Sequence, residues 1–155
     1  MAESHSTVIP ALRYRDAPVA IEWLCSVLGF TRHAVYEGAG GEINHAELVL
    51  GGGMIMLGSM KESEKGKENE QGKEDEQSRR FKSPAELGGA ETGSAYIVVP
   101  DADAVYARAQ AAGATIVRPL QQMDYGSREF TVNDPEGHSW SVGTYNPWSA
   151  QSGNS

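Results

Sequence analysis

The sequence predicts an α+β fold made of two βαβββ modules. Two observations support this prediction. The same order of elements occurs twice, on either side of a highly charged segment at residues 61–82. Each copy also supplies a single helix, which can cover only one face of a small sheet. The two remaining faces must bury each other or hold a ligand, and curled toward one another they would form a cup-shaped sheet.

The first copy opens with an apolar strand at Thr7–Tyr14. Asp16 followed by Pro18 is a typical helix start, because a carboxylate caps the first turn and proline fits there. Gly29 ends the helix. The residues of its apolar face follow the helical period and are Ile21, Leu24, Cys25 and Leu28. Three further strands are expected between glycine-rich turns, at Phe30–Tyr36, Glu42–Leu50 and Met54–Leu57.

The second copy repeats this order. A strand at Ser94–Val99 precedes Asp101, which caps a helix that ends at Gly113. The last three strands are expected at Thr115–Leu120, Glu129–Val132 and Ser139–Thr144. The internal duplication is therefore the strongest architectural signal in the chain.

The charged segment separates the two copies. Of the 22 residues from Lys61 to Lys82, seven are basic and seven are acidic. Gly66 and Gly72 interrupt any helix there, and little apolar area offsets the entropy of ordering, so we expect a solvated linker. A docking tail for a partner protein is the alternative. The predicted organisation is a first module at 1–58, a linker at 59–92, a second module at 93–146 and a tail at 147–155, together forming one domain.

Composition excludes several classes of protein. The 155 residues carry 13 Lys and Arg against 21 Asp and Glu, a net charge of −8, which disfavours nucleic acid or an anionic membrane as partner. No apolar run approaches the roughly 20 residues that span a bilayer. The single cysteine, Cys25, rules out an internal disulfide framework. We therefore expect a cytoplasmic protein with no membrane or nucleic-acid partner.

The most specific motif lies in the second copy, where Tyr125-Gly126-Ser127-Arg128 is followed by Asp134-Pro135-Glu136-Gly137-His138. Leu12-Arg13-Tyr14-Arg15-Asp16 and His45-Ala46-Glu47-Leu48 occur in register with it in the first copy. With these motifs the chain resembles the vicinal oxygen chelate superfamily, specifically its glyoxalase/bleomycin-resistance-like members, over roughly residues 8–57 and 94–145.

The resemblance implies a divalent metal held by four side chains, two from each half. Those positions fall on Ile9, Glu47, Ser94 and Ser141. Isoleucine has no donor atom and a neutral serine hydroxyl is a poor ligand, so Glu47 is the one competent donor. We therefore expect no metal and no other cofactor.

His45 and Glu47 leave one alternative open. Residues two apart on a strand point to the same face, so these two side chains could begin a rebuilt metal site with Tyr96 or His33 as a third ligand. The competing interpretation is a polar pair that lines a binding pocket.

Period-two alternation from Glu47 predicts the ligand-facing wall and places Trp140 on the helix side. If any residue is catalytic, it is Glu47. Arg13 and Glu47 could instead form a structural ion pair, and Arg128 could be a surface residue. The predicted ligand-binding residues are Arg13, His45, Glu47, Tyr96, Tyr125, Arg128 and Ser141.

The predicted function is binding or sequestration of a small, antibiotic-like molecule, aromatic or cationic, without a metal, as the resemblance implies for bleomycin-resistance proteins. The resemblance also implies a homodimer. The rival prediction is an enzyme: a lyase, isomerase or dioxygenase, either metal-dependent or using Glu47 as base and Arg13 to stabilise an oxyanion.

Overall fold

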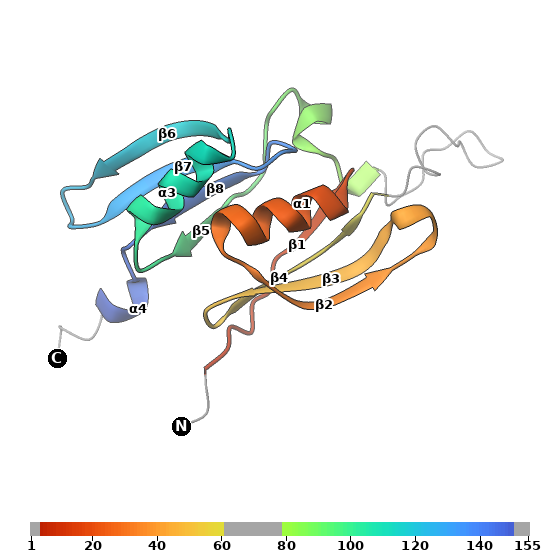
Figure 1. Cartoon of the computed structure of the whole chain (residues 1–155), viewed down its shortest axis with the longest axis horizontal. Coiled ribbons are helices and arrows are strands. Elements are labelled where there is room, and N and C mark those ends of the chain that lie inside the picture. The colour runs from red at the N-terminus through yellow and green to blue at the C-terminus, as the bar shows by residue number, and fades with distance from the viewer. Residues whose placement is uncertain (1–3, 61–78, 151–155) are drawn as a thin grey trace. The chain divides into compact units, whose positions relative to one another are not determined.

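The computed structural model describes residues 4–60 and 79–150, and its element order confirms the predicted α+β fold. The first module contains seven elements (Figure 1). They are β1 (Ala11–Tyr14), α1 (Ala17–Trp23), η1 (Leu24–Leu28), β2 (Thr31–Glu37), η2 (Ala39–Gly41), β3 (Ile43–Leu50) and β4 (Gly53–Ser59).

The second module repeats the strand–helix–three-strand order. After a short 3-10 helix, η4 (Pro84–Leu87), come β5 (Ala95–Val98), α3 (Ala102–Ala111), β6 (Thr115–Gln122), β7 (Arg128–Asn133), β8 (Ser139–Gly143) and the terminal turn α4 (Pro147–Ala150). Contacts divide the chain into two compact units. One comprises residues 1–90 with 135–137, and the other comprises 91–134 with 138–155. Closure of the two modules into one cup stays a prediction.

Both sheets have the same topology. In each, the first strand lies parallel beside the fourth, giving the orders β1-β4-β3-β2 and β5-β8-β7-β6. Arg13 pairs with Gly58 in the first sheet, and Val98 pairs with Gly143 in the second. The register therefore makes Gly58 and Gly143 equivalent positions, which matters for the sites described below.

Each module packs its helix against one sheet face. The buried apolar residues of the first module include Tyr14, Leu24, Leu28, Leu48 and Leu57, and those of the second include Val105, Ala109, Phe130, Trp140 and Val142. Trp140 is on the helix side, as predicted, and its indole N–H donates to the buried carboxylate of Asp134 at 3.2 Å.

The first helix begins as predicted and ends differently. The Asp16 carboxylate accepts a hydrogen bond from Val19 N at 3.2 Å, and Gly29 ends the helix at a φ of +89°. Its last turn, η1, is a π-helix, which carries more residues per turn than the α-helix assumed from the sequence. Val27 is buried there, whereas Cys25 is half-buried rather than part of the core.

Two other segments differ from the sequence-based expectation. The first strand starts at Ala11, so Ile9 precedes it, although Pro10 still accepts a hydrogen bond from Met56 N of β4 at 2.9 Å. The predicted linker overlaps Ser59, the last residue of β4, and it includes η4, where Ser83 is buried and caps the helix. Residues 61–78 of that linker lie outside the described part. Among the described helices, none is long and apolar enough to cross a membrane.

Candidate functional site

Each sheet leaves one face uncovered by its own helix, which we call the open face of that module. On β3 the buried Ala46 and Leu48 alternate with Glu47, and on β7 the buried Phe130 and Val132 alternate with Thr131. Since neighbouring side chains on a strand point to opposite faces, Glu47 and Thr131 belong to the open faces. The predicted alternation is therefore confirmed on β3, and β7 shows the same pattern.

The open face of the first module brings together three of the predicted residues. His45 Nε2 lies 3.4 Å from a Glu47 carboxylate oxygen, and the ring of Tyr36 stacks on His45 at 6.0 Å. Arg13 extends over Gly58, where an added Cβ would lie 2.6 Å from its guanidinium nitrogen, and it also lies over the ring of Phe81 at 5.8 Å. Glu47 therefore has an imidazole partner, and Arg13 lies against a glycine and an aromatic ring.

The open face of the second module is organised around Glu129, which the sequence analysis did not single out. This carboxylate is 6% exposed. The Tyr125 hydroxyl donates to both of its oxygens at 2.8 Å, and Arg118 contacts Oε2 at 3.3 Å. A buried carboxylate is costly unless its oxygens receive hydrogen bonds, so these two groups are what retain it there.

Two more tyrosines, Tyr96 and Tyr145, contact each other and the Tyr125 ring beside Glu129. The Tyr96 hydroxyl donates to the carbonyl of Tyr145 at 2.8 Å, and the Tyr125 and Tyr145 rings meet edge to face at 5.9 Å. Gly143 provides the space for this arrangement. A Cβ there would lie 2.5 Å from the Tyr96 hydroxyl and 2.7 Å from Cγ of Glu129. We call Tyr96, Tyr125, Tyr145 and Glu129 the tyrosine–glutamate cluster.

Two of the three tyrosines in this cluster, Tyr125 and Tyr96, have a raised pKa. The hydrogen bond to Glu129 raises the pKa of Tyr125, and burial raises the pKa of Tyr96. Because both phenols stay protonated, they act as hydrogen-bond donors toward groups within the protein. All three tyrosines of the cluster remain partly exposed. The exposed fraction is 55% for Tyr125, 39% for Tyr96 and 40% for Tyr145.

Arg128, a predicted ligand-binding residue, has a partner elsewhere. Its guanidinium forms a two-pronged pair with Asp103 of α3, at 3.0 and 3.2 Å. Hydrogen bonding to Arg128 lowers the pKa of Asp103. Arg128 therefore lies toward the helix of its module, whereas Tyr125, from the same motif, lies on the open face.

The positions that the family uses for a metal do not offer a fitting set of donors. Ser141 Oγ lies 3.3 Å from the Thr131 hydroxyl, so it meets another neutral group. The register also pairs Met56 with Glu47 in the first sheet and Ser141 with Thr131 in the second, which makes Met56, on β4, the counterpart of Ser141. Within residues 4–60 and 79–150, no group of three or more His, Cys, Asp or Glu side chains is placed to hold a metal. The donor set therefore does not fit a divalent metal of the kind the resemblance implies.

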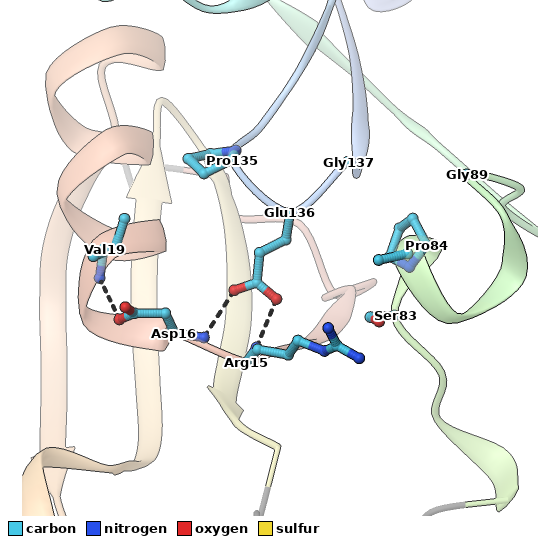
Figure 2. Close-up of a pocket in the computed structure, with 10 residues that line it drawn as sticks. Arg15, Asp16, Val19, Ser83, Pro84, Gly89, Pro135, Glu136 and Gly137 are labelled. Carbon is cyan, nitrogen blue, oxygen red and sulfur yellow. Dashed lines mark hydrogen bonds between the residues drawn. The ribbon is translucent and has the colours of Figure 1, made fainter.

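A separate pocket of about 530 Å³ lies in the first unit, at the start of α1 (Figure 2). Glu136 projects into it, and its carboxylate accepts hydrogen bonds from the backbone N–H groups of Arg15 at 2.6 Å and Asp16 at 2.9 Å. Pro84 and Pro135 are among its walls. The Glu136 carboxylate thus fixes the backbone between β1 and α1 by hydrogen bonds. We therefore assign this part of the pocket a structural role, which is to hold the start of α1.

One signal in the sequence would have found Glu129. Phe130 and Val132 are apolar and two apart, so period two places Glu129 and Thr131 on the opposite face. Burial of the glutamate was not readable in this way, because it depends on Tyr125, Arg118 and Gly143 meeting in three dimensions.

Two modules of identical topology, each with a polar and aromatic open face, define the class of paired βαβββ proteins. The family model "Glyoxalase/Bleomycin resistance protein/Dioxygenase superfamily" matches residues 6–142. The chain therefore belongs to this superfamily, as the sequence motifs predicted.

Several known proteins are similar to this chain in sequence or in structure. The uncharacterized protein Rv0887c of Mycobacterium tuberculosis is 32% identical over 134 residues, which is 86% of this chain and 71% of that protein. The crystal structure of TioX from Micromonospora sp. ML1 is 32% identical, covers 91% of this chain and 99% of TioX, and superposes with a TM-score of 0.64. The fosfomycin resistance protein FosX from Mesorhizobium loti is 13% identical, with a TM-score of 0.62 over 98% of this chain and 99% of FosX, so it shows the fold alone.

Proposed function

We propose that this protein binds and sequesters a small organic molecule, aromatic or cationic, on the open faces of its modules and without a metal ion. The observation that carries the proposal is the tyrosine–glutamate cluster, in which one of three partly exposed, mutually contacting tyrosines donates a hydrogen bond to a nearly buried carboxylate. Ligand sites combine apolar and aromatic surface with a few fixed polar groups in this way. The net charge of −8 adds a long-range attraction for cations.

Membership of the superfamily supports the choice of ligand class, because the family description includes bleomycin resistance. On the first module, Arg13, His45 and Glu47 would orient the ligand, and on the second Tyr96, Tyr125 and Ser141 would contact it. Arg128 is the least suited of the predicted residues, since Asp103 already occupies its guanidinium. We further propose that the protein acts as a cytoplasmic homodimer, which sedimentation analysis of the purified protein would test.

The direct test is a fluorescence titration of the purified protein with bleomycin and with ethidium, a planar aromatic cation. We expect saturable quenching of tryptophan emission, with the ligand recovered chemically unchanged after prolonged incubation. Recovery of a chemically modified ligand, or turnover of a panel of 2-oxoaldehydes and catechols, would contradict sequestration and show that the protein is an enzyme.

The enzymatic alternative is favoured by one specific observation, the 3.4 Å contact between His45 and Glu47 on the first module. A carboxylate beside an imidazole is an arrangement that can take up a proton from a substrate. Elemental analysis and calorimetric titration with Mn, Zn, Ni and Fe ions would separate metal binding from metal-free chemistry. Tight stoichiometric binding that is lost in Glu47→Ala, but kept in Glu37→Ala on the neighbouring strand, would overturn the metal-free proposal.

A further inference from the structure

We propose that the tyrosine–glutamate cluster selects ligands that carry a protonated amine attached to an aromatic ring. This inference rests on the proposed function, because it names the ligand class for the second module and the residue that recognises it. Glu129 is the group that recognises the amine, and Tyr96, Tyr125 and Tyr145 provide the aromatic surface next to it.

Glu129 has acceptor capacity left over. An ionised carboxylate offers about four acceptor positions. Among the described residues, its donors are the single proton of the Tyr125 hydroxyl, shared between both oxygens at 2.8 Å, and one long contact from Arg118 at 3.3 Å. The Glu129 side chain keeps a small exposed fraction of 8%, through which a donor from outside the protein can reach it. A ligand that brings N–H donors would complete its set of hydrogen bonds.

Two of the three tyrosines have their hydroxyls engaged within the protein. The hydroxyl of Tyr125 is directed at Glu129, and that of Tyr96 at the carbonyl of Tyr145. What remains accessible is aromatic surface, and aromatic faces attract ammonium groups through the ring quadrupole. A phenol that donates to a carboxylate becomes richer in electrons, which strengthens this attraction. The cluster therefore offers aromatic contact and a hydrogen-bond acceptor to the same cationic group.

Arg118 opposes the binding of a cation and so allows a sharp test. Its guanidinium contacts Oε2 and neutralises part of the charge of Glu129. If the ligand is a cation, removing Arg118 strengthens binding. If the ligand is an anion, Arg118 is its main attraction and removing it weakens binding.

The experiment is calorimetric titration of the full chain with four naphthalene derivatives that share one ring system. They are naphthylmethylamine, its trimethylammonium analogue, naphthylmethanol and naphthylacetate. We expect the amine to bind about tenfold more tightly than the alcohol and several-fold more tightly than the trimethylammonium analogue, which lacks N–H donors. Glu129→Gln removes the preference for the amine over the alcohol, and Arg118→Gln increases the affinity for the amine.

Tyr125→Phe and Tyr106→Phe form a matched pair, because both keep the ring. Tyr106 packs against Phe130 on the helix side of the module, so its variant should bind like the parent protein. Tyr125→Phe releases Glu129 from its shared donor, and the preference for the amine should change by several-fold while the fold, checked by circular dichroism, is kept. An unchanged preference in Tyr125→Phe would contradict the role given to this cluster.

The outcomes separate this inference from the proposed function. If the alcohol and the amine bind equally, a small aromatic molecule is still bound and the amine proposal is overturned. Tightest binding by naphthylacetate, weakened in Arg118→Gln, also overturns it. If no member of the series binds, this inference fails, and only bleomycin or ethidium binding in the separate titration would then sustain the proposed function.

Discussion

The two modules share one topology and carry different chemistry on their open faces. In each, a glycine on the fourth strand lets a side chain lie across the sheet: Arg13 over Gly58 in the first, and Tyr96 with Glu129 over Gly143 in the second. His45 and Glu129 occupy equivalent positions in the two sheets. Each comes directly before the residue that pairs with the apolar residue preceding the glycine, which is Leu57 in the first sheet and Val142 in the second. His45 is stacked by Tyr36, whereas Glu129 is hydrogen-bonded by Tyr125.

This comparison shows which parts of the duplicated motif are fixed by folding. The helix-side positions stay apolar in both copies, because they form the core of each sheet. The open-face positions are free to diverge, and one copy has a cation over its glycine where the other has a phenol and a carboxylate. The modules are therefore alike in what stabilises them and different in what they can bind.

The largest expected effect tests whether the cores are equally important. Trp140→Ala should lower the free energy of unfolding by about 4 kcal/mol, and Ile55→Ala on the matching strand by about 3 kcal/mol, since each leaves a cavity. The tryptophan variant also removes the indole donor of the buried Asp134. Urea unfolding followed by circular dichroism measures both changes. Losses below about 1 kcal/mol would show that these positions are not core residues.

The hairpin turns differ as well. Glu136 in the β7–β8 turn accepts hydrogen bonds from two backbone N–H groups, whereas the β3–β4 turn is made of Gly51 and Gly52. Glu136→Ala should cost about 1–2 kcal/mol of unfolding free energy, because the hydrogen bonds are charge-assisted. Glu22→Ala, which removes an exposed ion pair with Arg32, is the control and should cost less than about 0.5 kcal/mol. Equal losses in the two variants would remove the special role of Glu136.

The glycine pair tests the open faces directly. Gly143→Ala should push Tyr96 and Glu129 apart and weaken naphthylmethylamine binding about tenfold, because the added methyl overlaps both side chains. Gly58→Ala displaces Arg13 on the other module and should change that affinity by less than about twofold. Calorimetry measures the naphthylmethylamine affinity of both variants. A larger loss in Gly58→Ala than in Gly143→Ala would show that the amine binds to the first module.

A smaller effect appears at alkaline pH. The hydrogen bond to Glu129 raises the pKa of Tyr125 above its ordinary value of 10.0, so the folded protein keeps this proton to higher pH than the unfolded chain. The stabilisation is complete below the ordinary pKa and is lost as pH rises from there through the raised pKa. Tyr125→Phe should therefore lose less stability than the parent protein above about pH 10. Parallel stability curves for the two proteins would contradict this assignment.

The smallest expected change concerns Arg128. Because its guanidinium is engaged by Asp103, Arg128→Gln should leave naphthylmethylamine affinity unchanged. The lowered pKa of Asp103 means that the pair stabilises the fold above the ordinary carboxyl pKa and stops doing so as pH falls through the lowered value. A large loss of naphthylmethylamine affinity in Arg128→Gln would show that Arg128 contacts the ligand after all.

Local signals were sufficient to predict the fold. Asp16 and Asp101 mark the helix starts, Gly29 and Gly113 the ends, and alternation on β3 gives the correct faces. Each of these signals depends on neighbours a few residues away, so a single sequence contains it. The π turn at η1 was missed because an apolar stripe at Ile21, Leu24 and Leu28 looks the same for either helix type.

The site was predicted less completely, because it depends on distant partners. Arg128 belongs to a motif that carries the family resemblance, but its hydrogen bond to Asp103 joins residues 25 apart in the chain. Glu129 lies in a run read as an ordinary strand, and its burial comes from Tyr125, Arg118 and the missing side chain at Gly143. Period two can place these residues on a face, but it cannot show which of them meet.

The membership of residues 135–137 in the first unit has a practical consequence for dissecting this protein. A gene fragment that ends at Ala90 would lack Glu136 and leave the amides of Arg15 and Asp16 without their carboxylate acceptor. The complementary fragment would carry the Glu136 carboxylate without the two backbone N–H groups that donate to it. We therefore expect separately expressed halves to regain native stability only when they are mixed, which urea unfolding of each half and of the mixture would test.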